Sequence, residues 1–161
     1  MIVKAFEKIS NGYSPDRFLA DPSLVKKFNK LCVELGLKRK PVEINRRLLA
    51  MRKRTGGGLI KPTTNYDRRA GLIEKLGPAV EFAMTKMAVR FGASVDDLLA
   101  SPEIGSAFES VARRIIPRGT AVEYRLCALQ IRKATHVKGD MRTLFEEVTA
   151  HDIDSHAVWL C

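Results

Sequence analysis

The sequence contains an internal repeat at an offset of eighty positions, which restricts the fold to one built from two similar units. Placed over residues 81–134 without a gap, residues 1–54 share 12 identities, where unrelated sequences of ordinary composition would share about 3. Four of the shared residues are a glycine, a serine, an aspartate and a proline, types that often mark helix ends. We therefore predict an all-α fold in which two tandem, diverged helical repeats, each helix-turn-helix-like, pack as a pseudo-symmetric pair.

Each copy predicts the same series of helices. A first amphipathic helix is expected to end at Gly12 or Gly92, because glycine adopts the left-handed conformation of a helix C-cap at little cost. Ser14 and Ser94 then precede a short helical segment as N-caps, with acidic residues early in that segment. Both copies therefore begin with a helix, a turn and a short helix.

Two longer helices follow in each copy. Asp21-Pro22 and Ser101-Pro102 place an N-cap before a proline at the first helical position, which is a strong start signal. Apolar residues then recur at spacings of three and four, which predicts a face directed at the core. The two matching stripes are Leu24, Phe28, Leu31, Cys32 and Leu35, and Ile104, Phe108, Val111, Ala112 and Ile115. The last helix begins near Pro41 or at the Thr120–Glu123 capping box, and it ends in an Arg-Lys pair.

The repeat divides the chain into four segments. They are a basic first copy (1–54), a Gly-rich basic loop with a linking helix (55–80), a second copy (81–134), and a C-terminal helix with a tail (135–161). Three consecutive glycines at 56–58 cannot hold a helix, so this part is expected to be a loop. The linking helix is expected from about Asp67, interrupted at Gly77-Pro78, and the C-terminal helix at 141–148.

The net charge is concentrated in one part of the chain. The whole sequence holds 28 basic and 18 acidic residues, a formal charge of +10. Residues 26–69 alone hold 14 basic and 3 acidic residues. The first copy has a net charge of +9 and the second copy of only +2. Self-repulsion on this scale costs stability, so we expect the first copy to face an anionic partner.

The last helix of the first copy has an apolar face and a basic face. Its apolar side is expected to be Val42, Ile44, Leu48, Leu49 and Met51, and its outer side holds Glu43 and Ala50 among cations. The candidate nucleic-acid-binding residues are Lys26, Lys27, Lys30, Lys38, Arg39, Lys40, Arg46, Arg47, Lys53, Arg54 and Lys61. In the second copy, Leu126 and Cys127 replace Arg46 and Arg47, so its last helix is expected to pack against another element.

Residues 28–49, FNKLCVELGLKRKPVEINRRLL, resemble a helix-turn-helix. The resemblance departs at Asn45, where an apolar residue is expected, and Pro41 starts the second helix late. If the resemblance holds, Arg46, Arg47 and Ala50 would point into the DNA major groove. A different role is expected for Arg52 and Arg132, which lie within the apolar arcs of their helices. We expect these two arginines to be structural, with Asp16 and Asp96 as their natural partners.

Other functional classes find little support. The sequence has no run of roughly 18 apolar residues and no signal peptide, which favours a cytoplasmic protein without membrane contact. Three widely spaced cysteines do not predict disulfides, and we find no catalytic motif and no cofactor-binding motif. The spacing of the acidic and histidine residues at 151–156 matches no metal-ligand pattern.

The sequence therefore predicts a nucleic-acid-binding protein and not an enzyme. The expected ligand is duplex DNA, bound by the basic face of the first copy and the loop after it, and RNA is a further possible ligand. The alternative is a protein-interaction module for an acidic partner, which could form the N-terminal part of a larger enzyme. The oligomeric state is left open by the sequence.

Overall fold

The computed structural model describes residues 1–54 and 71–138, with side chains described to residue 52 and from 71 to 134. These residues form eight helices and no strand, which confirms the all-α prediction for this part of the chain. The helices are α1 (Ile2–Ile9), α2 (Pro15–Leu19), α3 (Pro22–Glu34), α4 (Pro41–Arg54), α5 (Leu72–Phe91), α6 (Val95–Ala100), α7 (Pro102–Ile115) and α8 (Ala121–Lys138). The expectations for Lys61, the glycines at 56–58, the 141–148 helix and the residues at 151–156 lie outside the described residues.

The predicted helix starts are confirmed by their caps. The side chains of Ser14, Asp21, Ser94 and Ser101 each accept a hydrogen bond from a backbone N–H in the first turn of α2, α3, α6 and α7. Before α8, the carboxylate of Glu123 accepts from the backbone N–H of Thr120 at 2.9 Å, which completes the predicted capping box. As a result, α2, α3 and α4 begin eighty residues before α6, α7 and α8.

The predicted interruption at Gly77-Pro78 is wrong, because α5 is one continuous helix across these residues. A proline inside a helix removes one backbone hydrogen bond and disfavours the helix by about 3 kcal/mol. Here the ring of Pro78 lies on the exposed side, and the buried side chains of Leu76 and Val80 hold the helix against its neighbours. The linking helix and the first helix of the second copy are therefore a single element.

The gapless pairing of the first helices is also wrong. α1 ends at Ile9 rather than Gly12, and it buries Ile2, Ala5 and Phe6. Eighty positions later, Phe82 and Lys86 lie on the exposed side of α5. An offset of 78 positions instead places the inner face of α1 over buried residues of α5, which are Val80, Ala83, Met84 and Met87. The connection after α1 is two residues longer than the one after α5, and this difference absorbs the shift.

The long helices follow the predicted stripe in their middle and depart from it at their ends. Phe28 and Phe108 are fully buried, as predicted for equivalent core residues. Leu35 and Ile115, the last residues of the two stripes, are 44% and 45% exposed. Both lie at or just beyond the last turn of their helix, where the other described helices leave them uncovered. Val25, in the first turn of α3, was not part of the predicted stripe, but it is buried.

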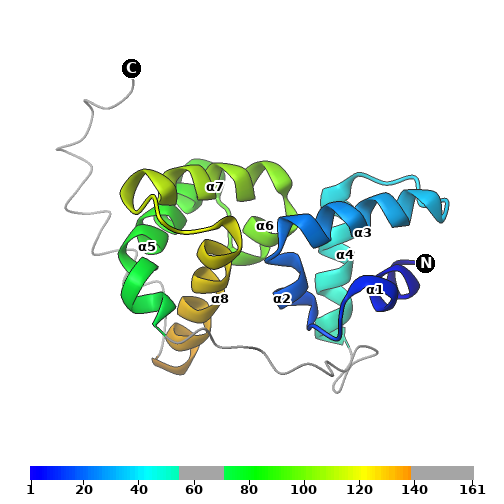
Figure 1. Ribbon diagram of the computed structural model, residues 1–161, viewed down its shortest axis with the longest axis horizontal. Coiled ribbons are helices and arrows are strands. Elements are labelled where there is room, and N and C mark those ends of the chain that lie inside the picture. The colour runs from blue at the N-terminus through cyan, green and yellow to red at the C-terminus, as the bar shows by residue number, and fades with distance from the viewer. Residues whose placement is uncertain (55–70, 139–161) are drawn as a thin grey trace.

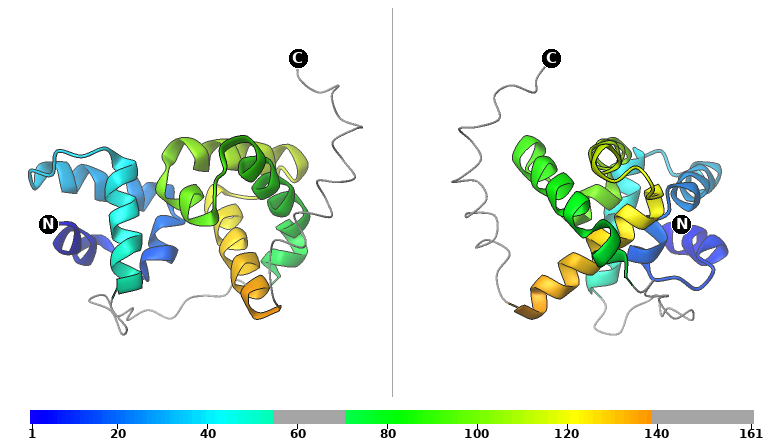
Figure 2. Two further views of the ribbon diagram at one scale, coloured as in Figure 1. Left: turned by 180° about the vertical axis from the view of Figure 1, so that it is seen from behind. Right: turned by 60° about the vertical axis from the view of Figure 1, so that its left-hand side comes forward.

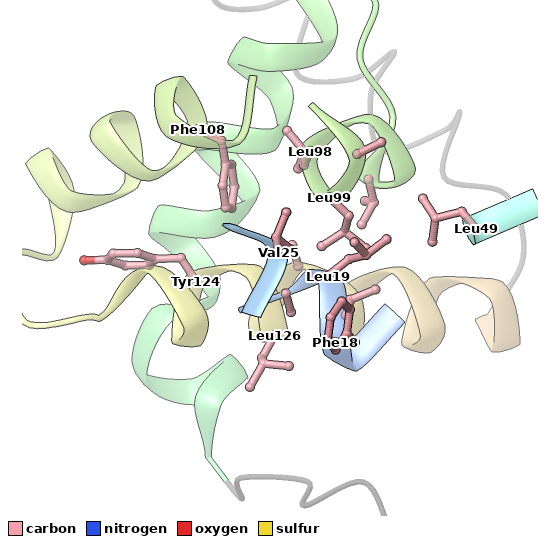
Figure 3. Close-up of a cluster of buried hydrophobic side chains, with 14 of the residues drawn as sticks. Phe18, Leu19, Val25, Leu49, Leu98, Leu99, Phe108, Tyr124 and Leu126 are labelled. Atoms are coloured by element: carbon pink, nitrogen blue, oxygen red, sulfur yellow. The ribbon is translucent and has the colours of Figure 1, made fainter. Parts of the chain in front are cut away.

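The helices form two groups that share one hydrophobic core. α1 to α4 occupy one end of the molecule and α5 to α8 the other, with α2 and α6 between them (Figure 1; Figure 2). In the first group, Phe18 packs edge to face against Phe6 and Phe28 at centroid distances of 5.0 and 5.5 Å. Figure 3 shows Phe18 near Leu99 and Leu126 of the second group. The core therefore continues across the junction of the two groups.

The last helix of the second copy packs as predicted against another element. α8 lies against α5, and Leu126 and Cys127 of α8 are buried. The thiol of Cys127 contacts the backbone oxygen of Leu72 at 3.5 Å. The position equivalent to Arg47 is thus covered in the second group by the start of α5. α1 has 8 residues where α5 has 20, so it is too short to cover α4 in the same way.

Four charged residues join the two groups. Arg52 pairs with Asp16, and Arg132 pairs with Asp96, which confirms the expected structural role of both arginines. The pairs also cross over: Arg52 Nη2 lies 3.5 Å from Asp96 Oδ2, and Arg132 Nη2 lies 3.7 Å from Asp16 Oδ2. Burial lowers the pKa of Arg52, while Asp96 acts in the opposite direction. The four side chains form one network across the junction.

Candidate nucleic-acid interface

The lysines of α3 lie on the side of the helix away from the core. Phe28 and Cys32 fix this orientation, because both are buried against α1 and α2. Lys26, Lys27 and Lys30 are exposed on the opposite side. The predicted α3 residues are therefore accessible to a large ligand.

The connection from α3 to α4 extends the exposed charge. Gly36 has a φ of 86°, a conformation that glycine adopts without strain, and it reverses the chain after α3. Lys38, Arg39 and Lys40 follow, and all three are exposed. These residues lead directly into α4 at Pro41.

The outer side of α4 is as predicted for the residues whose side chains are described. Ile44, Leu48 and Leu49 are buried, and Arg46 and Arg47 are exposed. The remaining outer residues, Glu43 and Ala50, are also exposed. The candidates Lys53 and Arg54 belong to the last turn of α4, and their side chains are not described.

A cavity shows that α3 and the start of α4 lie close together. It has a volume of about 420 Å³ and is lined by Lys26, by Pro41 and by residues of α7 and α8. The amide oxygen of Asn29, another lining residue, is buried without a hydrogen-bond partner among the described residues. Because Lys26 and Pro41 line the same cavity, Lys26 and the lysines just before Pro41, Lys38 and Lys40, lie in one region of the surface.

Few of these cations are neutralised within the molecule. Lys30 lies 3.9 Å from Glu34, and Arg39 lies 3.6 Å from Glu43. Both are exposed pairs of the i,i+4 type, which contribute little to stability. Five exposed cations have no carboxylate partner within the described part of the chain: Lys26, Lys27, Lys38, Lys40 and Arg47. We call these five residues the unpaired cations.

Arg46 has a partner that sequence reasoning missed. Its Nη2 lies 3.0 Å from Asp97 Oδ1, on α6 of the other group. Burial alone would raise the pKa of Asp97, but hydrogen bonds from Ser94 and Arg46 hold it below its ordinary value. No local pattern relates residues 51 positions apart, so only the packing of α4 on α6 reveals this pair.

Asn45 explains where α4 departs from a helix-turn-helix. Its side chain is fully buried and its amide nitrogen donates to the backbone oxygen of Ala100 at 2.9 Å. The equivalent position in α8 is Arg125, which is 5% exposed and donates to the backbone oxygen of Leu19. Each residue therefore bonds to the end of a short helix in the other group.

The described residues offer little for other chemistry. Burial raises the pKa of the Cys32 thiol, and burial with the nearby Glu81 raises that of Cys127 to about 12, so neither is a reactive thiolate at neutral pH. Within residues 1–54 and 71–138, no helix is long and apolar enough to cross a membrane. No protein family, curated protein or solved structure matches the chain.

Proposed function

We propose that this protein binds duplex DNA through the exposed basic side of α3, the α3–α4 connection and α4. The observation that carries the proposal is the set of five unpaired cations on adjoining elements. Cations clustered without counter-charges repel each other, and a polyanion relieves that repulsion while it releases its own counterions. We expect Arg47 to reach base edges, because a guanidinium can pair bidentately with guanine.

A comparison with the second group of helices supports the proposal that DNA binds to the first group. The positions equivalent to Lys26, Lys27 and Lys30 are Ser106, Ala107 and Ser110 in α7, which leave that surface without lysine. Leu126 and Cys127, which replace Arg46 and Arg47, are buried. The second group thus has no cation at the positions equivalent to Lys26, Lys27, Lys30, Arg46 and Arg47.

The test is binding of a labelled random-sequence DNA duplex, measured by fluorescence anisotropy over a salt series. If all five unpaired cations contact phosphates, log K should fall by about 4.5 for each tenfold rise in salt. The double change Arg46→Ala/Arg47→Ala should weaken binding, and it should reduce this slope by about 1 for each phosphate that the variant no longer binds. Both side chains are exposed, so the unfolding midpoint should change little.

Arg113→Ala/Arg114→Ala is the matched control, because this pair is also exposed and adjacent, on α7. The control pair should leave DNA binding nearly unchanged. Equal losses from the two double variants, or no binding by the wild type at low salt, would contradict the proposal. Tighter binding to polyglutamate than to DNA would favour the acidic protein partner, and tighter binding to an RNA duplex would favour RNA.

We also infer that the chain consists of two diverged copies of one four-helix unit, packed about a pseudo-two-fold axis. The support lies in reciprocal contacts, since a two-fold axis requires that each contact occur twice with the roles exchanged. Arg52 approaches Asp96 as Arg132 approaches Asp16. Asn45 and Arg125, at equivalent positions of α4 and α8, likewise each donate a side-chain hydrogen bond to a backbone oxygen of the other group. An experimental structure in which α2–α4 and α6–α8 failed to superpose would contradict this inference.

A further inference from the structure

The side of α5 that faces away from the core carries an exposed apolar stripe. Pro78, Phe82, Thr85 and Val89 follow one another at spacings of four, three and four, which places them along one line of the helix. Phe82 is 48% exposed and Val89 is 70% exposed. Thr85 is polar and half-buried, so the exposed apolar members of this line are Pro78, Phe82 and Val89. Exposed apolar residues gathered on one side of a helix favour a contact surface.

Opposite charges flank this stripe. Glu74 and Glu81 lie along one edge and Lys86 lies along the other, and all three are exposed. Glu81 precedes Phe82 by one residue, and Lys86 follows it by four. These are the positions that form salt bridges between the helices of a parallel coiled coil, where a residue pairs with the one five positions later in its neighbour.

We propose that the α5 stripe binds a second copy of this protein, with the two α5 helices parallel about a two-fold axis. A two-fold axis along the helices sets the acidic edge of one copy against the basic edge of the other. Glu81 of each copy then faces Lys86 of its neighbour. An antiparallel two-fold arrangement would instead set acidic edge against acidic edge, which is unfavourable.

The position of α5 leaves room for a second copy. α5 lies at the end of the molecule away from α1 and α3 (Figure 1; Figure 2). A copy bound there does not cover the unpaired cations, so the dimer does not depend on the DNA-binding proposal. The stripe extends over residues 78–89 only, which corresponds to a small interface and a reversible dimer.

The first experiment is sedimentation equilibrium of the full chain from about 1 µM to 1 mM, a range that covers weak dimers. The wild type should approach twice the monomer mass as concentration rises. Val89→Glu should raise the dissociation constant at least about tenfold. Val33→Glu is the matched control, because Val33 is 62% exposed on α3, and it should dimerise as the wild type does. Equal circular dichroism spectra would show that both variants remain folded.

The second experiment tests the parallel arrangement by exchanging charges. Glu81→Lys alone and Lys86→Glu alone should each dimerise weakly, because each places like charges across the interface. An equimolar mixture of the two variants should form a heterodimer, because both of its interfacial pairs join opposite charges. In one pair Glu81 faces Lys86, as in the wild type. In the other pair the new lysine at position 81 faces the new glutamate at position 86. A wild type that stays monomeric would overturn the proposal, whether or not another segment of the chain covers the stripe. A dimer that survives Val89→Glu, or charge variants that do not recover on mixing, would also overturn it.

Discussion

Truncation of Phe28 to alanine tests the assignment of the core, because this side chain is fully buried in the middle of α3. Removal of a buried phenylalanine side chain costs about 3–5 kcal/mol through lost burial and the cavity left behind. The ring also packs edge to face on Phe18 at 5.5 Å, which adds about 0.5–1.5 kcal/mol. We therefore expect a loss at the upper end of this range, which is a large fraction of the roughly 5–15 kcal/mol typical of such a chain.

The leucine variants separate the two contributions. Phe28→Leu keeps most of the apolar volume but removes the ring–ring packing, so it should cost about 1 kcal/mol more than Phe108→Leu. Phe108 is equally buried but has no ring–ring packing among the described residues. Equilibrium unfolding in urea, followed by circular dichroism, measures these differences. A loss below about 1 kcal/mol for Phe28→Ala would refute the core assignment. Val33→Ala, on the exposed side of α3, should stay within about 0.5 kcal/mol of wild type.

Two further changes test contacts that only the fold creates. Gly105→Ala should destabilise by about 1–3 kcal/mol in the same unfolding assay, because the added Cβ would meet the Arg125 guanidinium and lie 2.8 Å from the backbone oxygen of Leu98; an unchanged midpoint would contradict this packing. Asp97→Asn should lower stability at neutral pH by at most about 1 kcal/mol, since its partner Arg46 is largely exposed. The folded-state pKa of Asp97 lies below its ordinary 3.8, so its stabilisation is present above that pH and is lost as the pH falls through the folded value. A wild-type advantage over Asp97→Asn that persists in acid would contradict the role of this carboxylate.

Local sequence signals determined where most helices begin. N-caps and first-turn prolines act within one turn of the chain, so Asp21-Pro22 and Ser101-Pro102 specify the starts of α3 and α7 without tertiary contacts. The exposed basic side of α4 could be predicted for a similar reason, because helical periodicity separates the buried Ile44 from the exposed Arg47.

Packing between distant elements decided the rest. Sequence patterns placed a break at Pro78, yet burial of its neighbours keeps α5 continuous. The gapless alignment paired α1 with the wrong face of α5, because a shift of two residues turns a helix by more than half a revolution while leaving the downstream match intact.

The candidate interface shows the same division. Composition and the helical period are enough to predict which cations exist and which side of their helix they occupy. The packing of the helices sets which of them have no counter-charge among the described residues. Arg46 meets Asp97 because α4 packs on α6, whereas Arg47, one residue further along the helix, points away from that contact. Ion pairs between residues far apart in sequence depend on the placement of whole helices, and that placement is set by how the shared core is filled.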